Sequence, residues 1–353
     1  MEEYNVIGVM SGTSLDGVDI AYCKLSKLDN KWHYRIEKAV TYKYTEEWIS
    51  KLSNLEKEST FNFVKTHIEY GHYLGKLIKA FIDDNFLMID FVASHGHTIF
   101  HQTEKQITCQ IGDGASIAAE TKGIVVCDFR TLDVALGGQG APLVPIGDKI
   151  LFNDYDFCLN LGGFSNISFD LNNERRAYDI CPTNIILNYL ANKLNMNFDC
   201  SGKIAEQGII NNALLTELNN LEYYKKTFPK SLGKEWLYNI FIPIIEKYTE
   251  SIENKLRTVT EHIVIQLNIA TNFTKNKKIL ITGGGAYNEF LIRRLSSLTS
   301  HQIIIPDSKT IEFKEALVFA LLGILRIKKE INCLKSVTGA ANDSIGGAVY
   351  YGL

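Results

Sequence analysis

The sequence has little proline, no excess of either charge and no compositionally biased tract. Proline occurs 6 times in 353 residues, which argues against long disordered tails. The 37 Lys and Arg residues nearly balance the 40 Asp and Glu residues, for a net charge of −3. Nucleic-acid binders normally carry a basic stripe, and anionic membranes attract clustered basic residues. Neither nucleic acid nor a membrane is therefore expected as a partner.

The sequence also lacks a membrane-spanning segment, a signal peptide and paired cysteines. Its most apolar run, residues 316–325, is too short to cross a bilayer and is followed by basic residues. The start has no basic segment followed by an apolar one, so no signal peptide is predicted. The seven cysteines are scattered without a Cys-x-x-Cys pair, which favours a reducing cytoplasm over a disulfide framework or a zinc site.

What is present fits a soluble α/β protein. At about 100–200 residues per domain, the length suggests roughly two domains, and 46% hydrophobic residues can form a sizeable core. Strand-like and helix-like segments alternate, which predicts an α/β fold. Strands are expected at residues 4–10, 18–25, 32–40, 91–94, 124–127, 157–161, 166–171 and 278–281, and helices at 61–84, 287–298, 314–328 and 341–351, with a mostly helical region at 183–275.

A strand, a polar turn and a second strand occur twice, at residues 4–25 and again at 157–171. This faint duplication predicts two related lobes with a cleft between them. The boundary is expected near Gly138, giving an N-terminal lobe of residues 1–138 and a C-terminal lobe of residues 139–353. The last segment, 340–353, is expected to form a helix that packs back on the first lobe.

Three glycine-rich turns have compositions that suit phosphate or nucleotide binding. In residues 11–19, two glycines, three hydroxyls and two carboxylates can hold phosphate oxygens and orient Mg²⁺, although the turn lacks the Gly-Lys-Ser/Thr of a Walker loop. Residues 162–166 and 282–286 leave room for a phosphate or a flat ring. Ordinary turns explain the same compositions. The side chains concerned in the first turn are Ser11, Thr13, Ser14, Asp16 and Asp19.

Other polar clusters follow expected strands. Asp128, Arg130 and Asp133 lie where strand ends of α/β proteins face ligands, although a solvated ion pair fits equally. His95 and His97 share a strand face but have no acidic or cysteine partner nearby in sequence, so a sugar site or core histidines are favoured over a metal. Asp179, at the start of residues 179–184, either caps a helix or, in a closing cleft, acts as a general base.

Taken together, these segments resemble the anhydro-N-acetylmuramic acid kinases of the sugar kinase/actin/chaperone-ATPase superfamily. The resemblance runs almost end to end. Each motif is modest alone, but their order and spacing are highly specific. The matching segments are residues 8–19, 94–96, 128–130 with Asp133, 137–145, 160–163 with 166–167, 229–231 with Gly233 and Glu235, 283–286 with Asn288, 315–316, and 337–340.

The resemblance implies two ribonuclease-H-like (actin-like ATPase) lobes with ATP in the cleft, and a homodimer. It implies that 1,6-anhydro-N-acetylmuramic acid, ATP and water become N-acetylmuramic acid 6-phosphate and ADP, in cytoplasmic peptidoglycan recycling. Water would attack C1, and the released O6 would take the γ-phosphoryl group of ATP, with Mg²⁺ accompanying the triphosphate.

By position, the resemblance assigns Asp179 as the catalytic base. His97, Arg130, Asn184 and Glu315 fall where sugar-site residues are expected. No residue is assigned as a direct metal ligand, and Asp16 or Asp19 would reach the ATP-bound Mg²⁺ through water. The positions expected to bind ATP are Gly12, Thr13, Ser14, Leu15, Asp16, Gly17, Val18, Asp19, Gly162, Gly163, Gly283, Gly284 and Gly285.

The chain departs from the family at two motifs. Around the base the family usually reads Asp-Thr-Gly-Pro-Gly-Asn, and residues 179–184 read Asp-Ile-Cys-Pro-Thr-Asn. If the lost glycines needed positive φ, the local backbone and the fit of the sugar must differ. The family's His-Gly-Gln is His95-Gly96-His97 here, which changes a hydrogen-bonding group.

Two other functions fit the same residues. In an ordinary sugar kinase of the superfamily, Asp179 would deprotonate a free hydroxyl and no water would be consumed. In an ATP-dependent sensor or chaperone-like clamp, nucleotide binding would occur without sugar chemistry. The retention of Asp179 argues against the sensor.

Overall fold

The computed structural model describes residues 2–352, which form two compact units. Unit 1 consists of the residues up to Leu151 and those from Phe313 onward, and unit 2 is Phe152–Glu312. The division therefore lies after Leu151, not near Gly138. The reason is that the segment before Leu151 packs into unit 1, where a Cβ added to Gly147 would lie 2.5 Å from the side chain of Val318.

Unit 1 is built on a seven-stranded sheet. Its strands are β1 Glu2–Ser11, β2 Val18–Leu28, β3 Lys31–Tyr42, β4 Phe91–Gln102, β5 Ile107–Ile111, β6 Ile124–Cys127 and β12 Ala348–Tyr351. Their order is β12-β6-β4-β1-β2-β3, with β5 paired to β4. Asp29 and Asn30 turn the β2–β3 hairpin with φ of +49° and +61°, as a tight two-residue turn requires.

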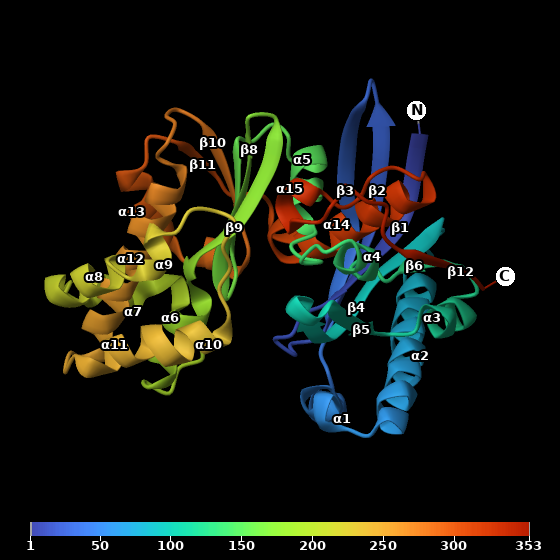
Figure 1. Ribbon diagram of the computed structural model, residues 1–353, viewed down its shortest axis with the longest axis horizontal. Helices are drawn as coiled ribbons and strands as arrows, with labels where there is room; N and C mark the ends of the chain where they lie inside the picture. The colour runs from blue at the N-terminus through green and yellow to red at the C-terminus, as the bar shows by residue number, and fades with distance from the viewer. Residues whose placement is uncertain (1, 353) are drawn as a thin grey trace. The chain divides into compact units, whose positions relative to one another are not determined.

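Helices cover both faces of this sheet (Figure 1). They are α1 Glu46–Asn54, α2 Thr60–Asp84, α3 Gly114–Thr121, α4 Thr131–Ala135, α5 Val144–Leu151, α14 Ser308–Ile327 and α15 Lys335–Thr338. Alternate residues of a strand face opposite sides. Ile7 and Val9 of β1 join the buried cluster that contains Leu74 of α2. A Cβ added to Gly8 would instead lie 1.8 Å from the carbonyl oxygen of Ala316 in α14.

Unit 2 repeats this strand order. Its strands are β7 Phe157–Leu161, β8 Phe164–Leu171, β9 Glu174–Pro182, β10 Lys278–Thr282 and β11 Gln302–Ile304, in the order β11-β10-β7-β8-β9. In each unit the first three strands form an antiparallel meander, and two later strands continue the sheet parallel to the first. Both sheets thus have the ribonuclease-H-like order that the resemblance implies, and the faint duplication is confirmed.

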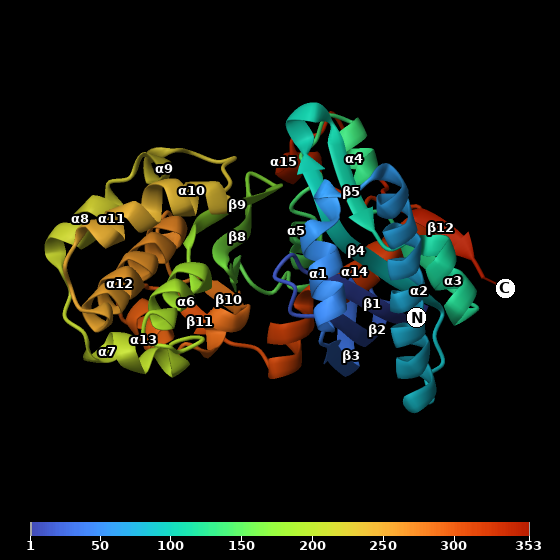
Figure 2. The same ribbon diagram turned by 90° about the horizontal axis from the view of Figure 1, so that it is seen from below.

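The helices of unit 2 gather around α12, as Figure 2 shows. They are α6 Asn184–Asn192, α7 Lys203–Gln207, α8 Asn212–Asn219, α9 Glu222–Lys225, α10 Lys234–Trp236, α11 Ile242–Lys247, α12 Ile252–Thr271 and α13 Glu289–Leu298. The Ser251 hydroxyl caps α12 by accepting a hydrogen bond from the Asn254 N–H. Val259 and Ile263 of this helix share one buried cluster with Leu159 of the sheet.

The predicted helix at 341–351 is wrong. The chain there is extended, and β12 pairs antiparallel with β6. Gly347 has a φ of +117°, which a helix does not tolerate. Val349, Tyr350 and Tyr351 belong to residue types that favour strands. The apolar spacing of this segment therefore reflects an edge strand of unit 1.

Candidate active site

Asp179 lies near the end of β9, where neighbouring segments hold it in place. Its Oδ2 atom accepts a hydrogen bond from the Leu232 N–H at 2.9 Å. The Tyr223 hydroxyl donates to the Asp179 carbonyl oxygen at 2.5 Å, and the Asp179 N–H donates to the Lys230 carbonyl oxygen at 3.3 Å. These contacts fix both the backbone of Asp179 and one of its carboxylate oxygens.

The surroundings of Asp179 raise the pKa of its carboxyl group above the ordinary value. Burial is the main cause because it disfavours the charged form, and the Leu232 N–H opposes it by stabilising that form. The side chain is only half-buried, so solvent or a small molecule can reach it. A reachable carboxylate with increased proton affinity has the properties of a general base.

Two glycine turns of unit 2 meet at Leu161, beside the start of α6. Asn184 donates from its N–H to the Gly162 carbonyl oxygen at 3.1 Å and from Nδ2 to the Leu161 carbonyl oxygen at 2.9 Å. Gly283, with φ of +79°, and Gly285 both approach Leu161, because an added Cβ would lie 2.9 Å and 2.6 Å from its atoms. Glycine is required at these two positions for close packing of the turns.

Three other glycines of these turns are not needed for packing. A Cβ added to Gly162, Gly163 or Gly284 would meet no atom of the protein closer than 3.4 Å. Gly163 and Gly284 are also exposed. Their bare backbone is therefore available for close approach by a ligand.

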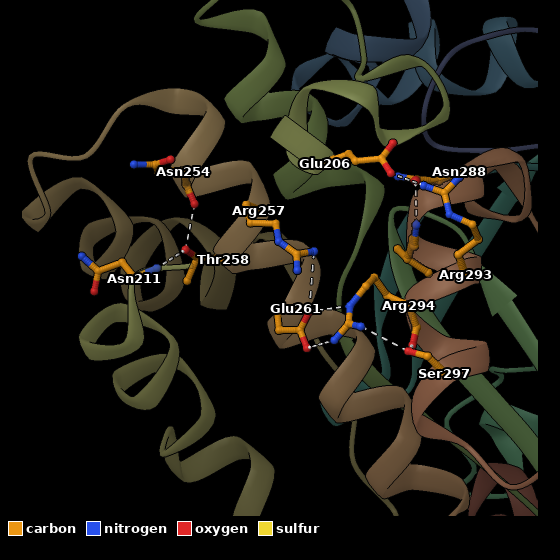
Figure 3. A network of polar contacts seen from close by, with 11 residues as sticks. Glu206, Asn211, Asn254, Arg257, Thr258, Glu261, Asn288, Arg293, Arg294 and Ser297 are labelled. Carbon is orange, nitrogen blue, oxygen red and sulfur yellow. Dashed lines mark hydrogen bonds and ion pairs between the residues drawn. The ribbon is translucent and has the colours of Figure 1, made fainter. Parts of the chain in front are cut away.

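The helix that follows the second glycine turn is anchored by a charge network (Figure 3). Glu261 of α12 accepts two hydrogen bonds from Arg294 of α13, at 2.8 and 3.1 Å, and lies 3.7 Å from Arg257. The Asn288 side chain caps α13 by accepting from the Leu291 N–H at 3.0 Å. A 3₁₀ turn, Gly284–Tyr287, precedes the cap, so α13 begins at Glu289 and not at residue 287 as predicted. The network therefore holds α13, the helix that follows the turn, against α12.

In unit 1, the Ser11 turn (residues 11–17) connects β1 and β2. The Leu15 N–H donates to the Gly12 carbonyl oxygen at 3.3 Å, and Leu15 has a φ of +62°. Thr13, Ser14 and Asp16 are exposed, which suits the role predicted for them.

The side chains of Ser11, at the start of this turn, and of Val18, just after it, are not available to a ligand. The Ser11 hydroxyl, predicted to hold phosphate, is directed into unit 1, where it hydrogen-bonds to Tyr44 and His97. Val18 is fully buried in the core, so only its backbone can meet a ligand. Asp19 is half-buried and accepts a hydrogen bond from the Thr41 hydroxyl at 2.6 Å.

Arg130 lies where its guanidinium group is held from two sides. Its Nε–H donates to His95 Nε2 at 2.9 Å, and Nη1 donates to the Gly140 carbonyl oxygen at 2.6 Å. Burial lowers the pKa of Arg130 to about 10, while Glu315 raises it, so the group stays cationic at neutral pH. Glu315 is exposed. The protein atoms around its carboxyl group displace water and disfavour the charged form, which raises the pKa, and the positive charge of Arg130 lowers it.

The sequence matches the family model described as anhydro-N-acetylmuramic acid kinase over residues 4–352. The chain belongs to the anhydro-N-acetylmuramic acid kinase family. Proteins of that name from Francisella tularensis subsp. novicida (strain U112) and Sulfurimonas denitrificans (strain ATCC 33889 / DSM 1251) are 35% and 33% identical to it. These alignments cover 99% and 98% of this chain, and 100% and 98% of the relatives.

The departure of this kinase from the base motif of its family is accommodated in the core. Ile180 and Cys181 are buried in the main apolar cluster of unit 2. Thr183, which replaces a glycine, has a φ of −127° and donates its hydroxyl to the Cys181 carbonyl oxygen at 3.3 Å. Neither replaced position therefore has a positive φ in this chain.

Tyr223 and Leu232 contact Asp179, and sequence reasoning assigned them no role. Leu232 is adjacent to the motif at 229–231, so the motif was a usable signal that the segment matters. Tyr223 lies in no motif. Its hydroxyl reaches a residue 44 positions away in the chain, which no local pattern indicates.

Within residues 2–352, no group of three or more His, Cys, Asp or Glu side chains is placed to hold a metal ion. The carboxylates of the Ser11 turn and of Asp19 are hard oxygen donors of the kind Mg²⁺ prefers, and too few for an all-protein cage. They fit an ion carried by a triphosphate. In the same part of the chain, no helix is long and apolar enough to cross a membrane.

Proposed function

We propose that this chain opens 1,6-anhydro-N-acetylmuramic acid with water and phosphorylates the released O6, giving N-acetylmuramic acid 6-phosphate and ADP. Membership of the family supports this reaction, which serves peptidoglycan recycling. The observation that carries the mechanism is the half-buried carboxylate of Asp179, oriented by Leu232 and with a raised pKa.

Asp179 acts as the base on the attacking water. As the water oxygen bonds to C1, the carboxylate takes one water proton and the C1–O6 bond breaks, leaving the electron pair on O6. O6 then bonds to the γ-phosphorus, and the bond to the bridging oxygen breaks, with ADP keeping that electron pair. The proton on Asp179 returns to solvent. Orientation by the Leu232 N–H keeps one carboxylate oxygen fixed while the other is available for the water.

ATP binds through backbone and hydroxyl groups. The Ser11 turn, with Gly12, Thr13 and Ser14 at its exposed side, contacts the phosphates. The open glycines at 162, 163 and 284 approach the nucleotide closely, and 283–285 flank the adenosine. Mg²⁺, when bound with ATP, supplies charge neutralisation for the triphosphate, and Asp16 or Asp19 would hold it through water.

The sugar is bound by polar side chains of both signs. Arg130 offers fixed N–H donors, Glu315 accepts from hydroxyls, and His97 and Asn184 supply further hydrogen bonds. Because Asn184 Nδ2 donates to Leu161, its Oδ1 atom is the part available to a ligand. Cytoplasmic location and a homodimer complete the proposal, and light scattering of the purified protein tests the dimer.

The deciding experiment compares wild-type protein with Asp179→Asn on anhydro and free N-acetylmuramic acid. We expect wild type to phosphorylate the anhydro sugar, and Asp179→Asn to lose kcat by orders of magnitude with little change in ATP binding. Asp170→Asn is the matched control because Asp170 is an exposed residue of the same sheet, and the Asn side-chain oxygen can still accept from the buried Arg175. Its kcat should stay within about twofold.

Each other outcome contradicts the proposal in a recognisable way. Equal turnover by Asp179→Asn and wild type would refute the role of Asp179. Phosphorylation of the free sugar alone would identify an ordinary sugar kinase. ATP binding without turnover of either sugar would indicate a sensor.

A further inference from the structure

A buried chain of polar side chains leads from the helices of unit 1 to His97. The Tyr70 and Tyr44 hydroxyls are 2.5 Å apart, the Tyr44 and Ser11 hydroxyls 2.6 Å, and Ser11 Oγ lies 2.8 Å from His97 Nδ1. None of the four residues is more than 8% exposed. We call Tyr70, Tyr44, Ser11 and His97 the relay.

Proton counting fixes the direction of these hydrogen bonds. The relay contains three hydroxyl protons and three hydrogen bonds. If His97 Nδ1 is bare, every proton has an acceptor: Tyr70 donates to Tyr44, Tyr44 to Ser11, and Ser11 to His97. If Nδ1 carried a proton, four protons would compete for these three short bonds, and one buried hydroxyl would be left without any of them. Leaving a buried donor unpaired is costly, so the first arrangement is favoured.

The same order defines the tautomer of His97. Burial lowers the pKa of His97 to about 4, so the ring is neutral at pH 7 and carries its proton on Nε2. Within residues 2–352, Nε2 hydrogen-bonds to no other group, and it is not among the polar atoms sealed from solvent without a partner. Its N–H is therefore a donor available to a bound molecule.

His95, two residues earlier, is held in the opposite form. Its Nε2 accepts from the Arg130 Nε–H, so Nδ1 carries the proton and donates to the Gly96 carbonyl oxygen at 2.8 Å. The two histidines of the His-Gly-His motif thus have different, environment-defined tautomers. His95 orients Arg130, and the relay orients His97.

We propose that Tyr70, Tyr44 and Ser11 are positioning residues that hold His97 as the Nε2–H tautomer and so present a fixed donor to an oxygen of the sugar. This rests on the proposed function, in which His97 contacts the sugar. A glutamine side chain accepts through its oxygen and donates through its nitrogen, so it can replace His97 in this arrangement without a relay-defined tautomer.

The first test is spectroscopic and needs no substrate. In protein labelled with nitrogen-15 histidine, with the His97 signals assigned by their loss in His97→Gln, we expect Nδ1 to be unprotonated and Nε2 protonated at neutral pH. Ser11→Ala should convert His97 to a mixture of tautomers, and Tyr44→Phe should shift the same resonances. Tyr73→Phe is the matched control because its ring packs on Tyr44 and Tyr70 but its hydroxyl lies outside the relay. It should leave His97 unchanged.

The second test is kinetic. We expect Ser11→Ala, Tyr44→Phe and His97→Leu to raise KM for the anhydro sugar about threefold to tenfold with kcat within about twofold, the size expected for one hydrogen bond. Tyr73→Phe, whose hydroxyl lies outside the relay, should keep KM within about twofold. If Ser11→Ala does not fold, Tyr44→Phe, which removes one oxygen atom, still decides.

A proton on Nδ1 of His97 in the wild type would overturn the proposal, as would a KM for Tyr44→Phe equal to that of Tyr73→Phe. Absence of sugar turnover by the wild type would instead refute the proposed function, and the tautomer measurement would still decide whether the relay exists.

Discussion

At the scale of single residues, Asp179 combines a charge with an environment that disfavours it. Burial raises its pKa, so the native protein binds the proton more tightly than the unfolded chain does. Between the ordinary and the raised pKa, stability therefore falls as pH rises. In the proposed mechanism this raised proton affinity serves the reaction, because a base with greater proton affinity takes a proton from water more readily.

The acid limb of the pH profile should report this carboxyl group. Asp179 must be ionised to act, so kcat/KM for the anhydro sugar should rise as pH increases through its raised pKa. The midpoint is expected above the ordinary value for Asp. The measurement is kcat/KM against pH, with Asp170→Asn as the control. A midpoint at or below the ordinary value would contradict the assignment.

A variant of Tyr223 tests whether the hydrogen bond to the Asp179 backbone is needed for activity. Tyr223→Phe removes the hydroxyl that donates to the Asp179 carbonyl oxygen, and we expect kcat to fall up to about tenfold with ATP affinity unchanged. Isothermal titration and steady-state assays separate the two effects. Tyr238→Phe, at an exposed site, should behave as wild type, and so would Tyr223→Phe if the contact were irrelevant.

At the scale of elements, the buried carboxylate of Glu261 links α12 to α13, the helix that follows the second glycine turn. Glu261 is 6% exposed and accepts from Arg294, whereas Glu206 of α7 and Arg293 of α13 form an exposed pair. Removing one partner of a buried pair leaves a charge without compensation, while exposed pairs contribute little.

We expect Glu261→Ala to lower the free energy of unfolding by about 3 kcal/mol, because Arg294 and Arg257 lose their partner. Glu206→Ala should cost less than about 1 kcal/mol. Urea denaturation of both variants measures the difference. Equal losses of unfolding free energy in the two variants would show that the buried ion pair of Glu261 contributes no more to stability than the exposed pair.

At the scale of the whole molecule, unit 1 is assembled from two separate stretches of chain. The chain leaves after Leu151 and returns at Phe313, where α14 has a non-helical residue (φ −113°, ψ 16°). The returning stretch adds α14 against β1 and β12 beside β6. The last residues are therefore part of the sheet in unit 1.

Deletion of residues 348–353 should destabilise the protein by about 3 kcal/mol, because β6 loses the ladder hydrogen bonds to β12 along Ile124–Cys127. Thermal unfolding followed by circular dichroism measures this. Tyr351→Thr, at an exposed position of β12, keeps the strand and should change stability by less than about 0.5 kcal/mol. An unchanged midpoint after deletion would show that β12 adds nothing.

A feature of this protein was predictable when the contacts that define it lie close together in the sequence. The strands at 157–161 and 124–127 and the long helix near 61–84 were predictable because alternation, helical spacing and caps are local signals. The roles of Asp179, Arg130 and the glycine turns were predicted from the order of motifs along the chain and stay predictions. The extended end at Ala348–Tyr351 was not, because its partner β6 lies far away in the sequence.

The sequence by itself determined the α/β class, the repeat of a strand–turn–strand unit and the family, since periodicity, turn composition and motif spacing are all encoded along the chain. Only the tertiary structure decided that Ser11 is directed inward to His97, that the Leu232 N–H reaches Asp179, and that the last strand completes the first sheet. Those outcomes depend on which distant groups meet when the core packs, and burial then sets their hydrogen bonds and charges.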